Sequence, residues 1–146
     1  MSPLADSLRA ALNAARKSQD KPRALVLGTI LANLKNRELE LGRDPTDDEV
    51  VDVIRKGIKL RREAAEQFGA AQRTDLADVE KRQIAVLEEF LPPAVDPAEI
   101  RAAARAAIAA GATDLGRVMG VVMPKFRGRA DGKLINQIVR EELHAG

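Results

Sequence analysis

Cysteine, tryptophan and tyrosine are absent from the 146-residue chain, which contains only three phenylalanines and one histidine. Without cysteine, disulfides and thiolate metal sites are excluded, and the composition is typical of a protein from a reducing compartment. Aromatic residues make up only 2% of the sequence, whereas β-sheets are enriched in aromatic and β-branched residues. The composition therefore predicts an all-α fold.

Long hydrophobic runs are also absent. No apolar segment approaches the roughly 20 residues that a membrane-spanning helix needs. Residues 1–20 lack the uninterrupted apolar stretch of a signal peptide, and their leucines are spaced as on an amphipathic helix. We therefore expect a cytoplasmic protein that does not associate with membranes.

The sequence contains little that would support catalysis. It has no glycine-rich phosphate loop, and a nucleophilic triad would lack its base because the single histidine, His144, lies at the C-terminal end. Acidic pairs such as Glu141-Glu142 point about 100° apart on a helix, so we interpret this pair as part of a solvated face. We expect no catalytic residue, no metal site, no cofactor and no activity of the chain alone.

Helical periodicity, by contrast, is present along the whole chain. Seven segments place apolar residues three and four positions apart, with start or stop signals at their ends. Thr46–Glu49 has the residues of a capping box, and Asp131 precedes the last segment as a cap. Pro92-Pro93 must end a helix because neither residue has a backbone donor. This break predicts an N-terminal helical subdomain over residues 1–93 and a C-terminal one over residues 94–146.

Basic residues are concentrated in the last third of the chain. The whole protein has a net charge of +2, but residues 116–140 hold six basic residues and a single acid, Asp131, and so carry +5. The six basic residues are Arg117, Lys125, Arg127, Arg129, Lys133 and Arg140. Because Asp131 is assigned to helix capping, the segment is expected to present an excess of positive charge.

The last helix is predicted to place polar and apolar side chains on opposite faces. Its polar face carries Lys133, Asn136, Gln137 and Arg140, at positions i, i+3, i+4 and i+7. Its apolar face carries Leu134, Ile135 and Ile138. Just before this helix, Gly128 lies between two arginines, where it permits a positive φ or the close approach of another backbone.

Two interpretations of the basic segment remain open, a solvated turn and a contact with nucleic acid. Phe126 is the one aromatic residue nearby, whereas proteins that bind single strands stack bases on aromatic rings. Arginine and lysine without aromatic partners suit phosphates and the shape of a folded RNA. A second basic group, residues 55–62, is followed by Glu63 and Glu66, and we interpret it as an ion-pair face of a helix.

The basic segment also carries a family resemblance. It reads MGVVMPKFRGRADGKLINQIVREEL and resembles the C-terminal part of the YqeY family and the tail domain of GatB, the B subunit of the tRNA-dependent amidotransferase. Two upstream stretches, LKNRELELGRDPTDDEVVDVIRKGIKLRREAAEQF and RTDLADVEKRQIAVLEEFLP, resemble the N-terminal half of YqeY proteins. The resemblance covers nearly the whole chain and implies a four-helix N-terminal part followed by a three-helix C-terminal part.

The resemblance implies a function in tRNA binding. In the amidotransferase the related tail contacts the body of the tRNA, and the same module is appended to some glutaminyl-tRNA synthetases. Carried over to this sequence, the role falls on Lys125, Arg127, Gly128, Arg129, Lys133, Asn136 and Arg140, with Arg117 added from the charge count. The expected partners are folded tRNA and a synthetase or amidotransferase subunit.

Two other functions remain as alternatives. The chain is a protein-interaction module that docks on a synthetase or amidotransferase subunit, or it shares the carbon–nitrogen ligase activity, with glutamine as amido-N-donor, that its kinship suggests. One position departs from the family pattern, because Gly28 stands in LVLGTIL where family members often have arginine. This departure puts in doubt any shared function of the N-terminal half that depends on that arginine.

Overall fold

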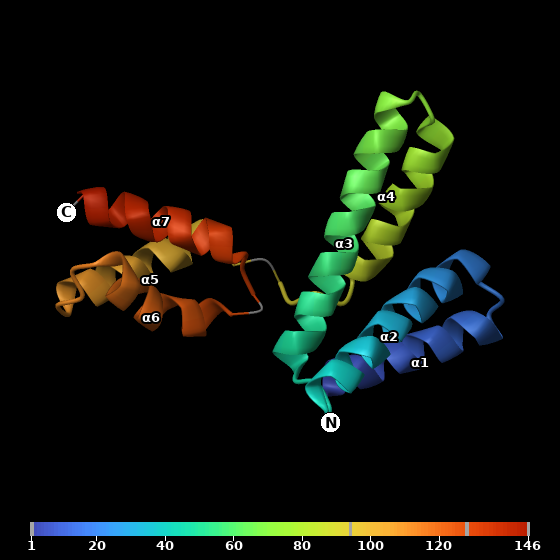
Figure 1. The fold of residues 1–146 in the computed structure, drawn as a ribbon, viewed down its shortest axis with the longest axis horizontal. Helices are drawn as coiled ribbons and strands as arrows, with labels where there is room; N and C mark the ends of the chain where they lie inside the picture. The colour runs from blue at the N-terminus through green and yellow to red at the C-terminus, as the bar shows by residue number, and fades with distance from the viewer. Residues whose placement is uncertain (1, 94, 128, 146) are drawn as a thin grey trace. The chain divides into compact units, whose positions relative to one another are not determined.

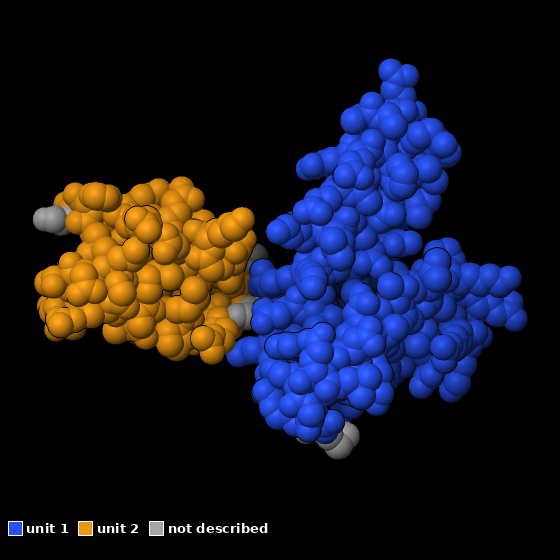
Figure 2. Space-filling model, viewed as in Figure 1, with its two compact units in different colours: residues 1–91 blue, residues 92–146 orange. Residues whose placement is uncertain are grey.

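The computed structural model describes residues 2–93, 95–127 and 129–145. Within these ranges the regular structure consists of seven helices and no strand (Figure 1), so the prediction of an all-helical fold is confirmed. The helices are α1 (Pro3–Lys17), α2 (Lys21–Leu41), α3 (Asp47–Ala70), α4 (Thr74–Glu88), α5 (Pro97–Ala109), α6 (Leu115–Phe126) and α7 (Gly132–Ala145). The chain forms two compact units, Met1–Leu91 and Pro92–Gly146 (Figure 2). None of the described helices is both long and apolar enough to cross a membrane.

The N-terminal unit is built from two helical hairpins. Helix α1 packs along α2, α3 packs along α4, and the two hairpins diverge from the region where α2 meets α3 and α4 (Figure 1). Their shared core contains the fully buried side chains of Leu8, Leu27, Ile30, Leu34, Ile54 and Leu87. One continuous core therefore joins the bases of the hairpins, while their free ends form separate arms.

Asp47, the first residue of α3, holds the beginning of α1. The Ser2 hydroxyl accepts a hydrogen bond from the Ala5 N–H at 3.1 Å and donates one to the Asp47 carboxylate. The same carboxylate accepts a hydrogen bond from the Leu4 N–H at 3.2 Å. Because the first N–H groups of a helix have no partner within it, these bonds both cap α1 and tie it to α3.

The predicted capping box at the start of α3 is confirmed. The Glu49 N–H donates to the Thr46 hydroxyl at 3.2 Å, and the Thr46 N–H donates to the Glu49 carboxylate at 2.9 Å. Arg43 donates two further hydrogen bonds to that carboxylate, at 2.7 and 3.1 Å. The bonds from Arg43, followed by the backbone bond from Thr46, lower the pKa of Glu49 to about 2. The carboxylate therefore remains charged over the whole physiological range.

Gly57 allows α2 and α4 to approach α3 closely. It is buried, and a Cβ atom added there would lie 2.6 Å from the Cδ1 atom of Ile30 in α2 and 3.7 Å from the Cδ1 atom of Leu87 in α4. Beside it, Arg61 donates one hydrogen bond to the Gly57 carbonyl and another to Gln83 of α4, both at 3.0 Å. The bare backbone at Gly57 is thus one point of close contact between the two hairpins.

The C-terminal unit packs α5, α6 and α7 around its own core. The fully buried side chains include Ile100 of α5, Val118 and Val122 of α6, and Ile135 and Val139 of α7. Ala104 and Ala107 face this core from α5, and their small side chains permit close helix approach. The packing leaves most polar residues of α6 and α7 on the surface, with Glu142 of α7 as a buried exception.

Two glycines in helices of the N-terminal unit are expected to respond oppositely to substitution by alanine. Gly57→Ala should lower the free energy of unfolding by about 1–2 kcal/mol, because overpacking at Ile30 outweighs the gain in helix propensity. Gly28→Ala should raise it by up to about 1 kcal/mol, since no atom lies within 4 Å of the added Cβ. Urea unfolding of both variants measures the difference, and a change of the same sign in both would contradict this account.

Candidate nucleic-acid interface

A tight turn connects α6 to α7 and carries three of the predicted contact residues. Helix α6 ends at Phe126, and the N–H groups of Arg129 and Ala130 both donate to the Phe126 carbonyl, at 2.9 and 3.0 Å. Lys125 and Arg127 are exposed beside this turn, as is Arg129. Gly128 lies outside the described residues, so the expectation of a positive φ at this position is untested.

Phe126 anchors the turn to the core of the C-terminal unit. Its side chain is buried in the core of the C-terminal unit, with 6% of the residue exposed. The Arg129 guanidinium lies over the ring, 5.9 Å from its centroid, which is within the range of a cation–π contact. The ring therefore supports Arg129 and is not presented to a ligand as a stacking surface.

Helix α7 begins as predicted, with Asp131 as its cap. The Asp131 carboxylate accepts a hydrogen bond from the Lys133 N–H at 3.0 Å, and the Asp131 carbonyl accepts one from the Ile135 N–H at 3.1 Å. Lys133 and Arg140 are exposed along the helix, on the side away from the buried Ile135. The predicted division of this helix into a polar and an apolar face is therefore confirmed.

The cations of this surface have few internal partners. Arg140 donates a hydrogen bond from Nε to the Asn136 side-chain oxygen at 2.7 Å, which orients both groups. Among the described residues, no ion pair joins Lys125, Arg127, Arg129, Lys133 or Arg140 to a carboxylate. We call these five residues, together with Asn136, the basic surface. Their positive charge is free to act on an external anion.

Arg117 stands apart from the basic surface. It lies in the first turn of α6, where its side chain pairs with Asp114 at 3.4 Å. The Asp114 carboxylate also caps the helix by accepting a hydrogen bond from the Arg117 N–H at 2.9 Å. Eight residues, or about 12 Å of helix, separate Arg117 from Lys125. Arg117 therefore belongs to the start of α6 and not to the turn.

The other end of α7 holds a cluster of ion pairs that sequence reasoning missed. Glu142 is 7% exposed and accepts hydrogen bonds from Arg105 Nε at 2.8 Å and from an Arg101 Nη atom at 2.9 Å. Arg101 also donates to Glu141 at 2.8 Å. The interpretation of this acidic pair as a solvated face is therefore wrong for Glu142, because both arginines reach it from α5. Their i, i+4 spacing was the signal in the sequence.

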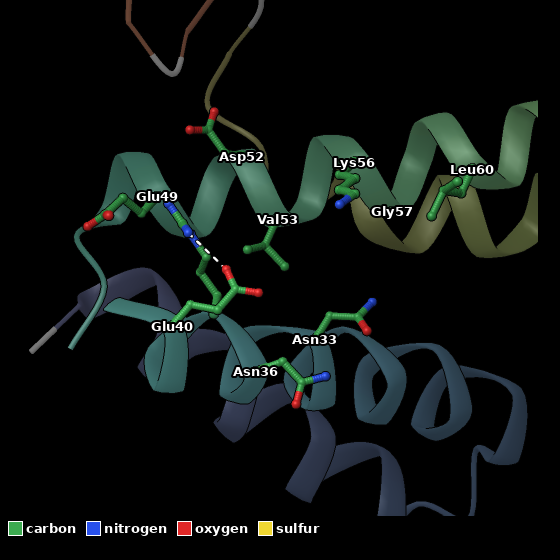
Figure 3. A pocket seen from close by; sticks show the side chains of 10 residues that line it. Asn33, Asn36, Glu40, Glu49, Asp52, Val53, Lys56, Gly57 and Leu60 are labelled. Carbon is green, nitrogen blue, oxygen red and sulfur yellow. Dashed lines mark hydrogen bonds and ion pairs between the residues drawn. The ribbon is translucent and has the colours of Figure 1, made fainter. Parts of the chain in front are cut away.

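A polar pocket of about 470 Å³ lies in the N-terminal unit, between α2 and α3. Asn33 of α2 and Val53 of α3 point into the space between the helices, whereas Asp52 points away from α2 (Figure 3). Glu40 accepts a hydrogen bond from Arg37 at 3.0 Å, and Glu49 is held by the capping box. With these two acids engaged and the third acid of the lining, Asp52, pointing away from α2, the described lining contains no nucleophile paired with a base.

Metal-ligand geometry is absent from the part of the chain that the structure describes. No group of three or more histidine, aspartate or glutamate side chains in that part lies close enough together to hold a metal ion. The basic surface is therefore the arrangement with the clearest chemical capacity, and that capacity is to bind an anion.

Comparison with known proteins supplies a family. A sequence model of the family described as Yqey-like protein matches residues 5–143. The protein named Altered inheritance of mitochondria protein 41, mitochondrial, from Pyrenophora tritici-repentis is 31% identical over 94% of this chain and 80% of its own length. Its namesake from Clavispora lusitaniae is 29% identical over 64% of this chain and 56% of the relative. An uncharacterized protein of Schizosaccharomyces pombe is 40% identical over 52% of this chain and 62% of the relative.

These relatives correct one expectation from the sequence. The prediction of a cytoplasmic location is wrong by this comparison, because two of the relatives are named as mitochondrial proteins. That prediction rested on the lack of cysteine and of an apolar leader. Neither feature distinguishes one reducing compartment from another, so neither could indicate in which compartment the protein is found.

The ion-pair cluster of α7 predicts a pH dependence of stability. The bonds from Arg105 and then Arg101 lower the pKa of Glu142 below its ordinary value of 4.5. A carboxyl whose pKa is lower in the folded state stabilises that state above the unfolded pKa and loses this effect as the pH falls. Glu142→Gln should therefore lower the Tm at pH 7, and the gap to the wild type should narrow as the pH falls below about 4.

Thermal unfolding between pH 3 and pH 7 measures this effect, with Glu63→Gln, at an exposed position in the middle of α3, as a control that leaves the Tm nearly unchanged. A gap between Glu142→Gln and the wild type that stays constant over this range would show that the loss is one of packing and not of charge.

Proposed function

This chain belongs to the Yqey-like protein family, and we propose that it acts as a tRNA-binding helical module that assists transamidation or aminoacylation without catalysing a reaction alone. Family membership names no ligand by itself. The proposal rests on one observation: five exposed cations that have no carboxylate partner among the described residues lie around the turn between α6 and α7 and along α7 as far as Arg140.

Phosphate recognition is the chemistry that such a surface supports best. Nucleic-acid backbones carry closely spaced negative charges, and cations that replace their condensed counterions bind with a strong dependence on salt. Lys125, Arg127 and Arg129 follow one another along the turn, where three side chains can reach successive phosphates. Contacts of this kind position an RNA without reading its sequence.

Folded RNA fits the basic surface better than a single strand does. Single-strand binders place aromatic rings against successive bases, and Phe126 is withdrawn into the core. Double-stranded and folded RNA is recognised chiefly through its shape and backbone. The hydrogen bond between Arg140 and Asn136 orients a guanidinium farther along α7, and an oriented cation favours a rigid anionic partner.

Two alternatives use other properties of the chain. As a protein-interaction module, it would dock the polar face of α7 on a synthetase or amidotransferase subunit. As a carbon–nitrogen ligase with glutamine as amido-N-donor, the purified chain would have to show activity on its own. A pull-down of a partner protein that survives nuclease treatment would favour the interaction module. Ligase activity of the purified chain alone would favour the enzyme.

The turn is tested by removing its two arginines. Arg127→Ala/Arg129→Ala should weaken binding to folded tRNA by about tenfold or more and should reduce the slope of log K against log salt by about two, one for each lost phosphate contact. Titration against tRNA and a length-matched unstructured RNA, at two or more salt concentrations, measures both quantities. We expect tighter binding to the folded RNA.

A matched control comes from the N-terminal unit. Arg16→Ala/Lys17→Ala removes the same charge from two adjacent exposed positions at the end of α1. If this control weakens tRNA binding as much as the turn variant does, the attraction is one of net charge, and the turn is not the binding site.

A further inference from the structure

An apolar groove lies between the arms of the N-terminal unit, far from any residue of the basic surface in the sequence. It has a volume of about 800 Å³ and is lined by the first residues of α2 and by one side of α4. Figure 2 shows the hollow between these arms as a notch in the outline of this unit. We call it the arm groove.

The arm groove exposes large apolar side chains that the fold does not use. Leu25 of α2 is 64% exposed and Val79 of α4 is 40% exposed. Val26 and Val86 line the same groove more deeply. Scattered exposed hydrophobic residues are normal, but apolar side chains gathered in one concave site are typical of a binding surface.

The rim of the arm groove is positively charged. Lys21 and Arg82 are exposed on its two sides, and neither has an ion pair among the described residues. Arg23 is already held, since it pairs with Glu89 at 2.7 Å and lies over the Phe90 ring at 5.9 Å. The acid of the lining, Asp20, caps α2 by accepting a hydrogen bond from the Arg23 N–H at 3.2 Å.

The groove residues on α4 form one continuous face of that helix. Val79, Arg82, Gln83 and Val86 occupy positions i, i+3, i+4 and i+7 and form one face that is about 10 Å long. An amphipathic helix presents anchors over the same repeat and docks by laying its apolar side into such a groove. A ligand that complements the apolar bottom and the cationic rim of the groove would carry apolar side chains flanked by acidic ones.

We propose that the arm groove binds an amphipathic helix of a partner protein whose apolar face is flanked by aspartate or glutamate. A symmetric groove-to-groove contact with a second copy of this chain is disfavoured, because two cationic rims would face each other. RNA is disfavoured because its phosphates have no favourable contact with the leucine and valine side chains at the bottom of the groove. A membrane is disfavoured because its flat surface does not fit into a concave site. The site is separate from the basic surface, so this proposal does not depend on RNA binding.

The proposal is tested with a designed helical peptide that has leucine at positions i, i+3, i+4 and i+7 and glutamate on the flanks. A counterpart carries lysine in place of glutamate. Fluorescence anisotropy of the labelled peptides against the full chain should show about tenfold tighter binding of the acidic peptide. Leu25→Gln/Val79→Gln should weaken that binding by about tenfold or more, and Lys21→Gln/Arg82→Gln should remove the preference for acid.

Two matched variants serve as controls. Leu39→Gln/Leu60→Gln changes two apolar residues that are 71% and 55% exposed but lie outside the arm groove, and it should leave peptide binding unchanged. Arg127→Ala/Arg129→Ala should also leave it unchanged, which separates this site from the proposed RNA surface.

Several results would overturn the proposal. These are equal binding of the acidic and basic peptides, and peptide binding that survives Leu25→Gln/Val79→Gln. Sedimentation that shows a dimer dissociated by the groove variant would assign the groove to a second copy of the chain. Loss of tRNA binding in the groove variant would assign it to RNA.

Discussion

The contact between Ile30 and the bare backbone of Gly57 determines the shape of the N-terminal unit. Because no side chain separates the helices there, α2 crosses α3 at close range, and Leu87 brings α4 to the same point. The hairpins are joined at this crossing and diverge beyond it. The polar pocket between α2 and α3 and the arm groove between α2 and α4 both lie where the two hairpins face each other. The close approach at Gly57 therefore helps to set how near the helices that line them lie.

In the C-terminal unit, the arrangement of charge follows from how α7 is packed. Its acids near the C-terminal end, Glu141 and Glu142, accept hydrogen bonds from Arg101 and Arg105 of α5. Asp131, the acid just before the helix, accepts a hydrogen bond from the Lys133 N–H and so serves as its cap. The cations of the preceding turn and of α7 as far as Arg140 are left without carboxylate partners among the described residues. The positive surface is therefore a product of tertiary pairing elsewhere on the same helix, and not only of local composition.

Features encoded within one turn of helix could be predicted from the sequence. The cap at Asp131, the box of Thr46 and Glu49 and the two faces of α7 each depend on residues three or four positions apart. Features that depend on two helices could not be predicted in this way. Glu142 resembles any surface acid until α5 is placed against it, and Leu25 and Val79 are 54 positions apart in the sequence. The basic segment lies between these cases, since its charge can be counted but its lack of carboxylate partners depends on the fold.

The bond between Ser2 and Asp47 has a consequence for the order of folding. Most helix contacts join neighbours in the chain, α1 with α2 and α3 with α4, and local contacts of this kind form quickly. The Ser2–Asp47 bond spans 45 positions, and closing a longer loop costs more chain entropy. We therefore expect this bond to form late in folding. Contacts that are absent from the transition state slow unfolding without speeding folding, so this bond at the start of α1 should contribute to how long the unit stays folded rather than to how fast it folds.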